Sequence, residues 1–117
     1  MTAQRRLSVV LYQETPGVWV GRGVEHDLSA EGRTIGETVR AMLRFVDAHS
    51  QFDVRHDRTP LSAFRPAPQA YWNAFETGTQ VTLSQLGAEP LVHWDVSVAI
   101  ASHRPSLRPR SSVRATA

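Results

Sequence analysis

The chain of 117 residues contains no cysteine and no lysine, and no apolar run reaches the roughly 18 residues of a membrane-spanning helix. Without cysteine it can form neither disulfides nor thiolate metal sites, which fits a cytoplasmic protein. The N-terminal stretch also lacks the apolar core and cleavage site of a secretory signal. We therefore expect one globular domain, in the cytoplasm and without membrane contact.

Charge is distributed unevenly along the chain. All 13 basic residues are arginine, and all 11 acidic residues precede Ser102. Residues 1–101 are expected to form the domain, with a balance of −2 because nine arginines face 11 acids. Residues 102–117 are expected to be a basic tail of Arg, Pro and Ser. Nucleic acid is expected to bind weakly at most, by phosphate contacts of the tail, whose four arginines are Arg104, Arg108, Arg110 and Arg114.

The first third of the chain has the pattern of short strands. "LSVVLYQ" (residues 7–13) and "VWVGRGVEH" (residues 18–26) are rich in β-branched and aromatic residues, which favour strands. Between them, "TPG" predicts a type II turn with Pro16 second and Gly17 third. "DLSAEG" (residues 27–32) is expected to be a short third strand.

The stretch "GRTIGETVRAMLRFVDAH" predicts an amphipathic helix that ends near His49. Thr34 suits the N-cap, and Glu37 three residues later completes a capping box. The predicted apolar stripe consists of Ile35, Val39, Met42, Leu43 and Val46.

The remainder is expected to add a loop, a second helix and two strands. Residues 50–68 are expected to form a long loop, and "PQAYWNAFETG" a short helix between Pro68 and Gly78. "TQVTLSQL" (residues 79–86) is expected to be a strand, followed by a turn. "LVHWDVSVAI" (residues 91–100) alternates apolar and polar residues with the period of a strand.

These elements predict an α+β fold with the order β-β-β-α-(α)-β-β. We expect an antiparallel sheet of four to five strands with one main helix packed on one face. The reverse face would then be free for association.

The segment from Leu7 to His49 resembles the N-terminal domain of HicB-like antitoxins. The resemblance is carried by "GVWVGRGVEHDLSAEGRTIGETVRAMLRFVDAH". Gly17 and Trp19 match the turn glycine and strand aromatic of that family, and its helix-start motif is matched by Gly32, Thr34 and Glu37.

The resemblance implies a non-catalytic sheet domain that self-associates and binds a partner protein, which in that family is a small ribonuclease toxin. Two features depart from the family. "GVEHDL" stands where the family has a proline- and glycine-containing loop, and the DNA-binding part of these antitoxins has no counterpart here. We therefore expect a regulatory or protein-binding module, a homo-oligomer with a small toxin-like protein as a possible partner.

His93, Asp95 and Ser97 are the candidate catalytic residues, because a spacing of two places them on one face of the last predicted strand. They include the residue types of a hydrolytic triad, yet same-face neighbours lie about 6–7 Å apart, beyond hydrogen-bond reach. A polar sheet face is the simpler interpretation. His56 and Asp57, near Asp53, form a second candidate.

No metal or cofactor is expected, since the second candidate lacks a further histidine at helical spacing. If the chain is an enzyme instead of a binding module, we expect a small hydrolase or nuclease that uses His93 and Asp95, or His56 and Asp57.

Aromatic residues are the candidate partner contacts. Trp19 shares a strand face with two glycines, Gly21 and Gly23, which leaves a space for a neighbouring element or a partner. On the second predicted helix, the aromatic side consists of Tyr71, Trp72 and Phe75. This side could dock on a partner or cover the sheet of its own chain.

Overall fold

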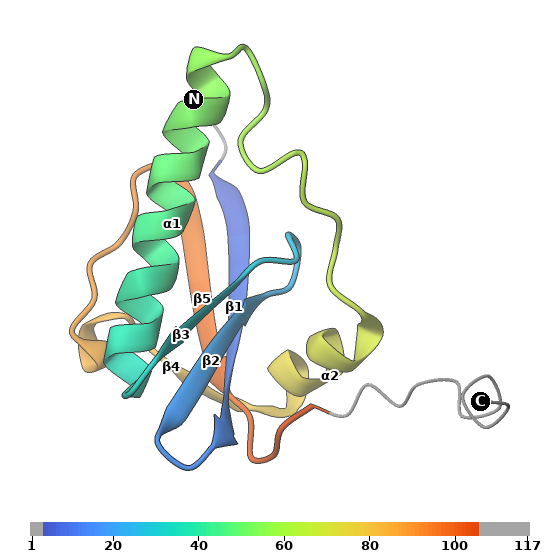
Figure 1. Cartoon of the computed structure of the whole chain (residues 1–117), viewed down its shortest axis with the longest axis vertical. Helices are drawn as coiled ribbons and strands as arrows, with labels where there is room; N and C mark the ends of the chain where they lie inside the picture. The colour runs from blue at the N-terminus through green and yellow to red at the C-terminus, as the bar shows by residue number, and fades with distance from the viewer. Residues whose placement is uncertain (1–3, 106–117) are drawn as a thin grey trace, which may run out of the picture.

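The structure is a computed structural model that describes residues 4–105. It is an α+β fold with one five-stranded sheet and two α-helices (Figure 1). The predicted order of strands and helices is confirmed. The elements are β1 (Arg5–Thr15), β2 (Val18–Gly23), β3 (Ser29–Gly32), α1 (Ile35–Arg55), α2 (Gln69–Thr77), β4 (Thr79–Val81), the 3₁₀ helix η1 (Ser84–Leu86) and β5 (Trp94–Ile100).

The sheet is mixed, with the strand order β3-β2-β1-β5-β4. The prediction of a wholly antiparallel sheet is wrong for the central pair. β1 and β5 run parallel, from the Arg5–Trp94 pair to the Leu11–Ile100 pair, whereas the other neighbours are antiparallel. Alternation along a strand indicates which face is buried, but not whether the neighbouring strand runs parallel or antiparallel. The sequence pattern therefore could not predict the direction of the β1–β5 pair.

The β1–β2 connection has the predicted turn. Gly17 adopts a φ of 81°, the left-handed backbone that the third position of a type II turn requires. Pro16 occupies the second position, where its ring presets φ. Beyond the turn, β2 pairs antiparallel with β1 from Val18 to Gly23.

Helix α1 begins as predicted but ends later than His49. The Thr34 hydroxyl accepts the Glu37 N–H at 3.1 Å, and the Glu37 carboxylate accepts the Arg33 N–H at 2.7 Å. The predicted loop over residues 50–68 is wrong in its first part, because the helix continues to Arg55. The apolar pattern did not predict this extension, because its core-facing residues Ser50 and Asp53 are polar although both are buried.

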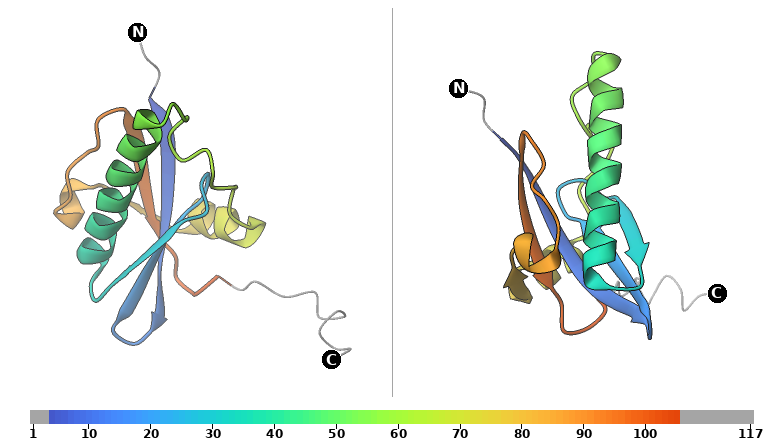
Figure 2. Two further views of the ribbon diagram at one scale, coloured as in Figure 1. Left: turned by 45° about the horizontal axis from the view of Figure 1, so that its top comes forward. Right: turned by 90° about the vertical axis from the view of Figure 1, so that its left-hand side faces the viewer.

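Helix α1 lies along one face of the sheet (Figure 2) and forms the main core there. Gly21 and Gly32 allow its first turns to approach closely. A Cβ built on Gly32 would lie 2.6 Å from the Thr38 hydroxyl, and one on Gly21 3.3 Å from the Thr38 methyl. The fully buried side chains of this core include Leu7, Val9 and Leu11 of β1, Val39, Met42 and Val46 of α1, and Leu61.

The reverse face of the sheet is not free, in contrast to the prediction. A second core forms there between strands and helix α2, and Ala67 and Tyr71 pack on it from the segment after α1. The strand residues of this core are Val10, Tyr12, Val20 and Val24. The domain therefore has three layers, with a helix on each face.

The last two strands are shorter than predicted. β4 ends at Val81, because Thr82 begins a reciprocal cap instead of continuing the strand. Its hydroxyl accepts the Gln85 N–H at 3.2 Å, and the Gln85 side chain accepts the Thr82 N–H at 2.8 Å. β5 begins at Trp94, since Val92 and His93 form a turn in which His93 has a φ of 71°.

Each α-helix of residues 4–105 packs against one of the two cores. None of these helices is long and apolar enough to cross a bilayer, although α1 has 21 residues.

Candidate binding surfaces at the open edges of the sheet

Strand β3 forms one open edge of the sheet. Gly23 donates its N–H to the Leu28 carbonyl at 2.8 Å, and the register then places Ala30 and Gly32 in the bonded pairs with β2. Because bonding direction alternates along an antiparallel strand, the backbone groups of Ser29 and Glu31 point away from the sheet. Both residues are exposed. This edge can therefore receive a further strand.

Strand β5 has a second open edge over its first four residues, 94–97. The ladder with β4 stops at the Val81–Val98 pair. The backbone N–H of Arg5 in β1 donates to the His93 carbonyl. The odd-numbered residues of β5 therefore bond to β1, and the even-numbered residues direct their backbone groups to the opposite side. The N–H and carbonyl of Val96 and the carbonyl of Trp94 thus face the open side.

The open side of β5 is a groove with a volume of about 560 Å³. The chain between β4 and β5 leaves the plane of the sheet there and forms a wall through Leu83 and Leu91. These leucines pack on the same core as α1, so this wall is apolar. On the other face of the sheet, the groove is lined by Asp95 and Ser97.

The alternative catalytic candidates His93, Asp95 and Ser97 do not line one common cavity. His93 lies in the turn before β5 and borders a different cavity, of about 370 Å³, beside the last turns of α1. The Asp95 carboxylate lies 3.5 Å from the Arg6 guanidinium, and both side chains are exposed. Two of the three candidates, Asp95 and Ser97, therefore line the groove, whereas His93 lies outside it.

His56 and Asp57 terminate helix α1. The backbone N–H of His56 donates to the carbonyls of Phe52 and Asp53, and its ring Nδ1 lies 2.8 Å from the Phe52 carbonyl oxygen. Asp57 has a φ of 56°, which turns the chain away from the helix. Within residues 4–105, no three His, Asp or Glu side chains come close enough together to hold a metal ion.

Asp53 has a structural role that the sequence pattern did not predict. Its side chain is 2% exposed, and its carboxylate accepts the Leu61 N–H at 2.7 Å. The Nε2 atom of His49 lies 3.5 Å from the same oxygen. Asp53 therefore holds the loop after α1 against the helix, and brings Leu61 into the core.

The predicted partner-binding aromatics are all in packed positions. Trp19 packs against the α1 core, and Tyr71 and Phe75 pack against the core on the reverse face. Trp72 is half-buried, and its indole N–H donates to the Ala67 carbonyl at 2.9 Å. All four side chains thus make contacts within the chain, and Trp19, Trp72 and Phe75 are only partly buried.

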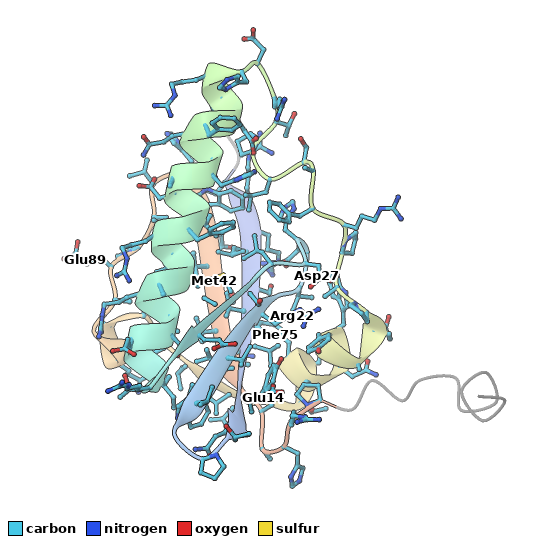
Figure 3. All side chains as sticks on the ribbon, in the orientation of Figure 1. Glu14, Arg22, Asp27, Met42, Phe75 and Glu89 are labelled. Atoms are coloured by element: carbon cyan, nitrogen blue, oxygen red, sulfur yellow. The ribbon has the colours of Figure 1, made fainter. Side chains whose placement is uncertain are left out.

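A polar cluster between β2 and α2 was missed in the sequence (Figure 3). Arg22 donates to both carboxylate oxygens of Asp27, at 2.6 and 3.3 Å, and to the Tyr71 hydroxyl at 3.1 Å. The Arg22 guanidinium also lies 4.4 Å from the centre of the Tyr71 ring. The Arg22–Asp27 hydrogen bond raises the pKa of the guanidinium. Burial, and next the neighbouring Tyr71 hydroxyl, raise the pKa of Tyr12 to about 12.

The predicted nucleic-acid contacts fall mostly outside the described residues. Arg104 is described, and its guanidinium lies 3.4 Å from the Glu14 carboxylate in an exposed pair. The other three, Arg108, Arg110 and Arg114, lie beyond residue 105.

Comparison of the chain with protein-family models, with curated proteins and with solved structures finds no match. The surfaces described above are therefore interpreted from their own geometry.

Proposed function

We propose that the chain is a non-catalytic protein-binding module that resembles the N-terminal domain of HicB-like antitoxins without their DNA-binding part. Its hairpin, short third strand and capped helix α1 lie over the residues that carry the resemblance, which supports the proposal. A small toxin-like protein is the partner that the resemblance implies. The proposal rests mainly on one observation, the open edge of β3.

Self-association at this edge replaces the sheet face as the proposed contact. Helix α1 covers one face of the sheet, and α2 covers much of the other. The rest of the reverse face is occupied by polar pairs, such as the Ser8 hydroxyl and N–H that donate to the Glu25 carboxylate, both at 2.7 Å. At an edge, by contrast, the backbone donors and acceptors already point outward, so a second copy can bind without displacing packed or paired side chains.

A second copy fits the β3 edge in one favourable register. With Ala30 on the two-fold axis, Ser29 of each copy lies opposite Glu31 of the other. This antiparallel arrangement joins the outward backbone groups in four hydrogen bonds and keeps the two Glu31 carboxylates from lying directly opposite each other. The two sheets would then form one continuous sheet of ten strands.

The test of self-association is a proline substitution at the outward position of β3. Glu31→Pro removes an N–H that points away from β2 and therefore leaves the β2–β3 ladder in place. We expect the unchanged protein to be a dimer and Glu31→Pro a monomer with the same circular dichroism. The molar mass is measured by size-exclusion chromatography with light scattering over a dilution series.

Glu31→Thr is the matched control, because it removes the same carboxylate but keeps the N–H, and it should remain dimeric. An unchanged protein that is monomeric at the highest concentration, or a dimer that Glu31→Pro leaves intact, would contradict the proposal.

A further inference from the structure

We infer that the groove beside β5 binds an extended segment of a partner protein, whose side chains alternate between apolar and basic. This site is separate from the β3 edge, and the inference goes beyond self-association. It depends on three properties of the groove, which are its backbone groups, its walls and its charge.

The backbone groups allow a strand to be added. Val96 offers both an N–H and a carbonyl on the open side, and Trp94 offers its carbonyl, while the Trp94 N–H donates to Leu91. A segment that continues the line of β4 would run antiparallel to β5 and bond to these groups, which is the mode of β-strand addition. Four residues of the segment would span about 13 Å along the open stretch.

The walls select a segment rather than a second domain. The segment between β4 and β5 borders the groove through Thr82, Leu83, Pro90 and Leu91. A single extended chain has no neighbouring elements to bring against this wall, whereas the edge of a folded sheet would bring its own. The occupant is therefore a peptide segment and not another copy of the sheet.

The two sides of the groove require different side chains. On the α1 side, Leu83, Leu91 and Val96 pack with the main core and present apolar surface. On the opposite side, Asp95 is the charged residue among those that line the groove. Alternate residues of a bound strand point to opposite faces, so one set would be apolar and the other basic.

Arg6 does not prevent this recognition. Its guanidinium lies 3.5 Å from the Asp95 carboxylate, but the side chains of Arg6 and Asp95 are 62% and 56% exposed. Exposed ion pairs contribute little, so a basic residue of the segment can share or replace Arg6.

The experiment uses two synthetic peptides with capped ends, Val-Arg-Val-Arg-Val-Thr and Val-Glu-Val-Glu-Val-Thr. Each is titrated into ¹⁵N-labelled full-length protein, and amide shifts are followed by NMR. We expect shifts centred on Val96 and its β5 neighbours. The arginine peptide should bind about threefold more tightly than the glutamate peptide, as an exposed charge contact allows.

The variant Asp95→Arg should reverse this preference, because it reverses the charge of the groove. Glu89→Arg is the matched control. It changes the net charge equally on an exposed residue that does not line the groove, and it should leave the preference unchanged.

Three results would overturn the inference. These are no shift at Val96 with either peptide, the same preference in Asp95→Arg as in the unchanged protein, and shifts at Val96 that depend on protein concentration without peptide. The last result would assign the groove to self-association. Loss of dimerisation in Glu31→Pro leaves this test unaffected, so the two proposals can fail separately.

Discussion

At the scale of single residues, charged and polar side chains connect elements that are distant in the chain. Arg22 of β2 binds Asp27 before β3 and the hydroxyl of Tyr71 in α2. Tyr12 of β1 lies beside the same tyrosine, with ring centres 6.1 Å apart. Asp53 plays a similar part after α1, where it accepts the N–H of Leu61. These contacts fix α2 to the sheet and the loop after α1 to that helix.

Tyr12 predicts a loss of stability at high pH. Its pKa is raised to about 12 in the folded protein, against 10.0 for an ordinary tyrosine, so folding favours the neutral form. The resulting stabilisation is complete below pH 10 and is lost as the pH rises toward 12, by about 2 to 3 kcal/mol.

Urea unfolding measured between pH 8 and pH 12 tests this expectation. The free energy of unfolding of Tyr12→Phe should fall less steeply above pH 10 than that of the unchanged protein, because phenylalanine does not titrate. Titrating groups that do not interact with Tyr12 cancel in this difference. Parallel curves for the two proteins would show that Tyr12 titrates alike in the folded and unfolded states.

At the scale of elements, the position of α1 on the sheet depends on two glycines under its first turn. Gly21 and Gly32 lie on neighbouring strands, and the buried Thr38 side chain approaches both. The Thr38 hydroxyl donates to the Thr34 carbonyl at 2.8 Å, so the helix start is tied to its cap. A side chain at either glycine would push this end of the helix outward.

Gly32→Ala should destabilise the protein more than Gly21→Ala. The new methyl at residue 32 would lie 2.8 Å from the Thr38 backbone nitrogen, which cannot move alone. At residue 21 it would lie 3.2 Å from the end of the Leu11 side chain, which needs to shift by only a few tenths of an ångström. Losses of about 2 and 1 kcal/mol are expected from overpacking.

Urea unfolding of the two single variants compares these losses directly. Each variant serves as the control for the other, since both replace a strand glycine under α1 by the same methyl. An equal loss, or a larger one for Gly21→Ala, would mean that Thr38 does not set the distance of the helix.

At the scale of the whole molecule, two separate cores stabilise one sheet. The core under α1 is the larger, and the core under α2 contains two tyrosines beside valines. Helix α1 covers one face of the sheet and α2 covers much of the other, so the backbone groups open to a further strand lie at the edges. These edges are β3 on one side, and β4 with the first half of β5 that it leaves uncovered on the other. This arrangement is the reason that both proposed contacts use edges.

The second core predicts that α2 stabilises the fold. Tyr71 is 5% exposed, so Tyr71→Ala should lower the free energy of unfolding by about 3 kcal/mol, as for other large buried aromatics. Glu76→Ala, on the exposed side of the same helix, should change it by less than about 0.5 kcal/mol. Thermal or urea unfolding measures both. A negligible loss for Tyr71→Ala would instead favour the docking role predicted from the sequence.

The sequence alone determined the features that depend on neighbouring residues. The Pro16–Gly17 turn, the Thr34 cap and the order of the elements follow from local backbone preferences and from the period of the apolar residues. The end of β4 had a local signal too, in Thr82 and Gln85, and the strand prediction overlooked it.

The tertiary structure decided what depends on residues far apart in the chain. The burial of Asp53 extended α1, because its carboxylate is satisfied by the loop that follows, and this cannot be recognised from helical periodicity. The parallel pairing of β1 with β5 depends on the path of about 80 intervening residues, which no pattern within either strand records. The candidate binding surfaces arise in the same way, since a free edge exists only where the neighbouring strand stops.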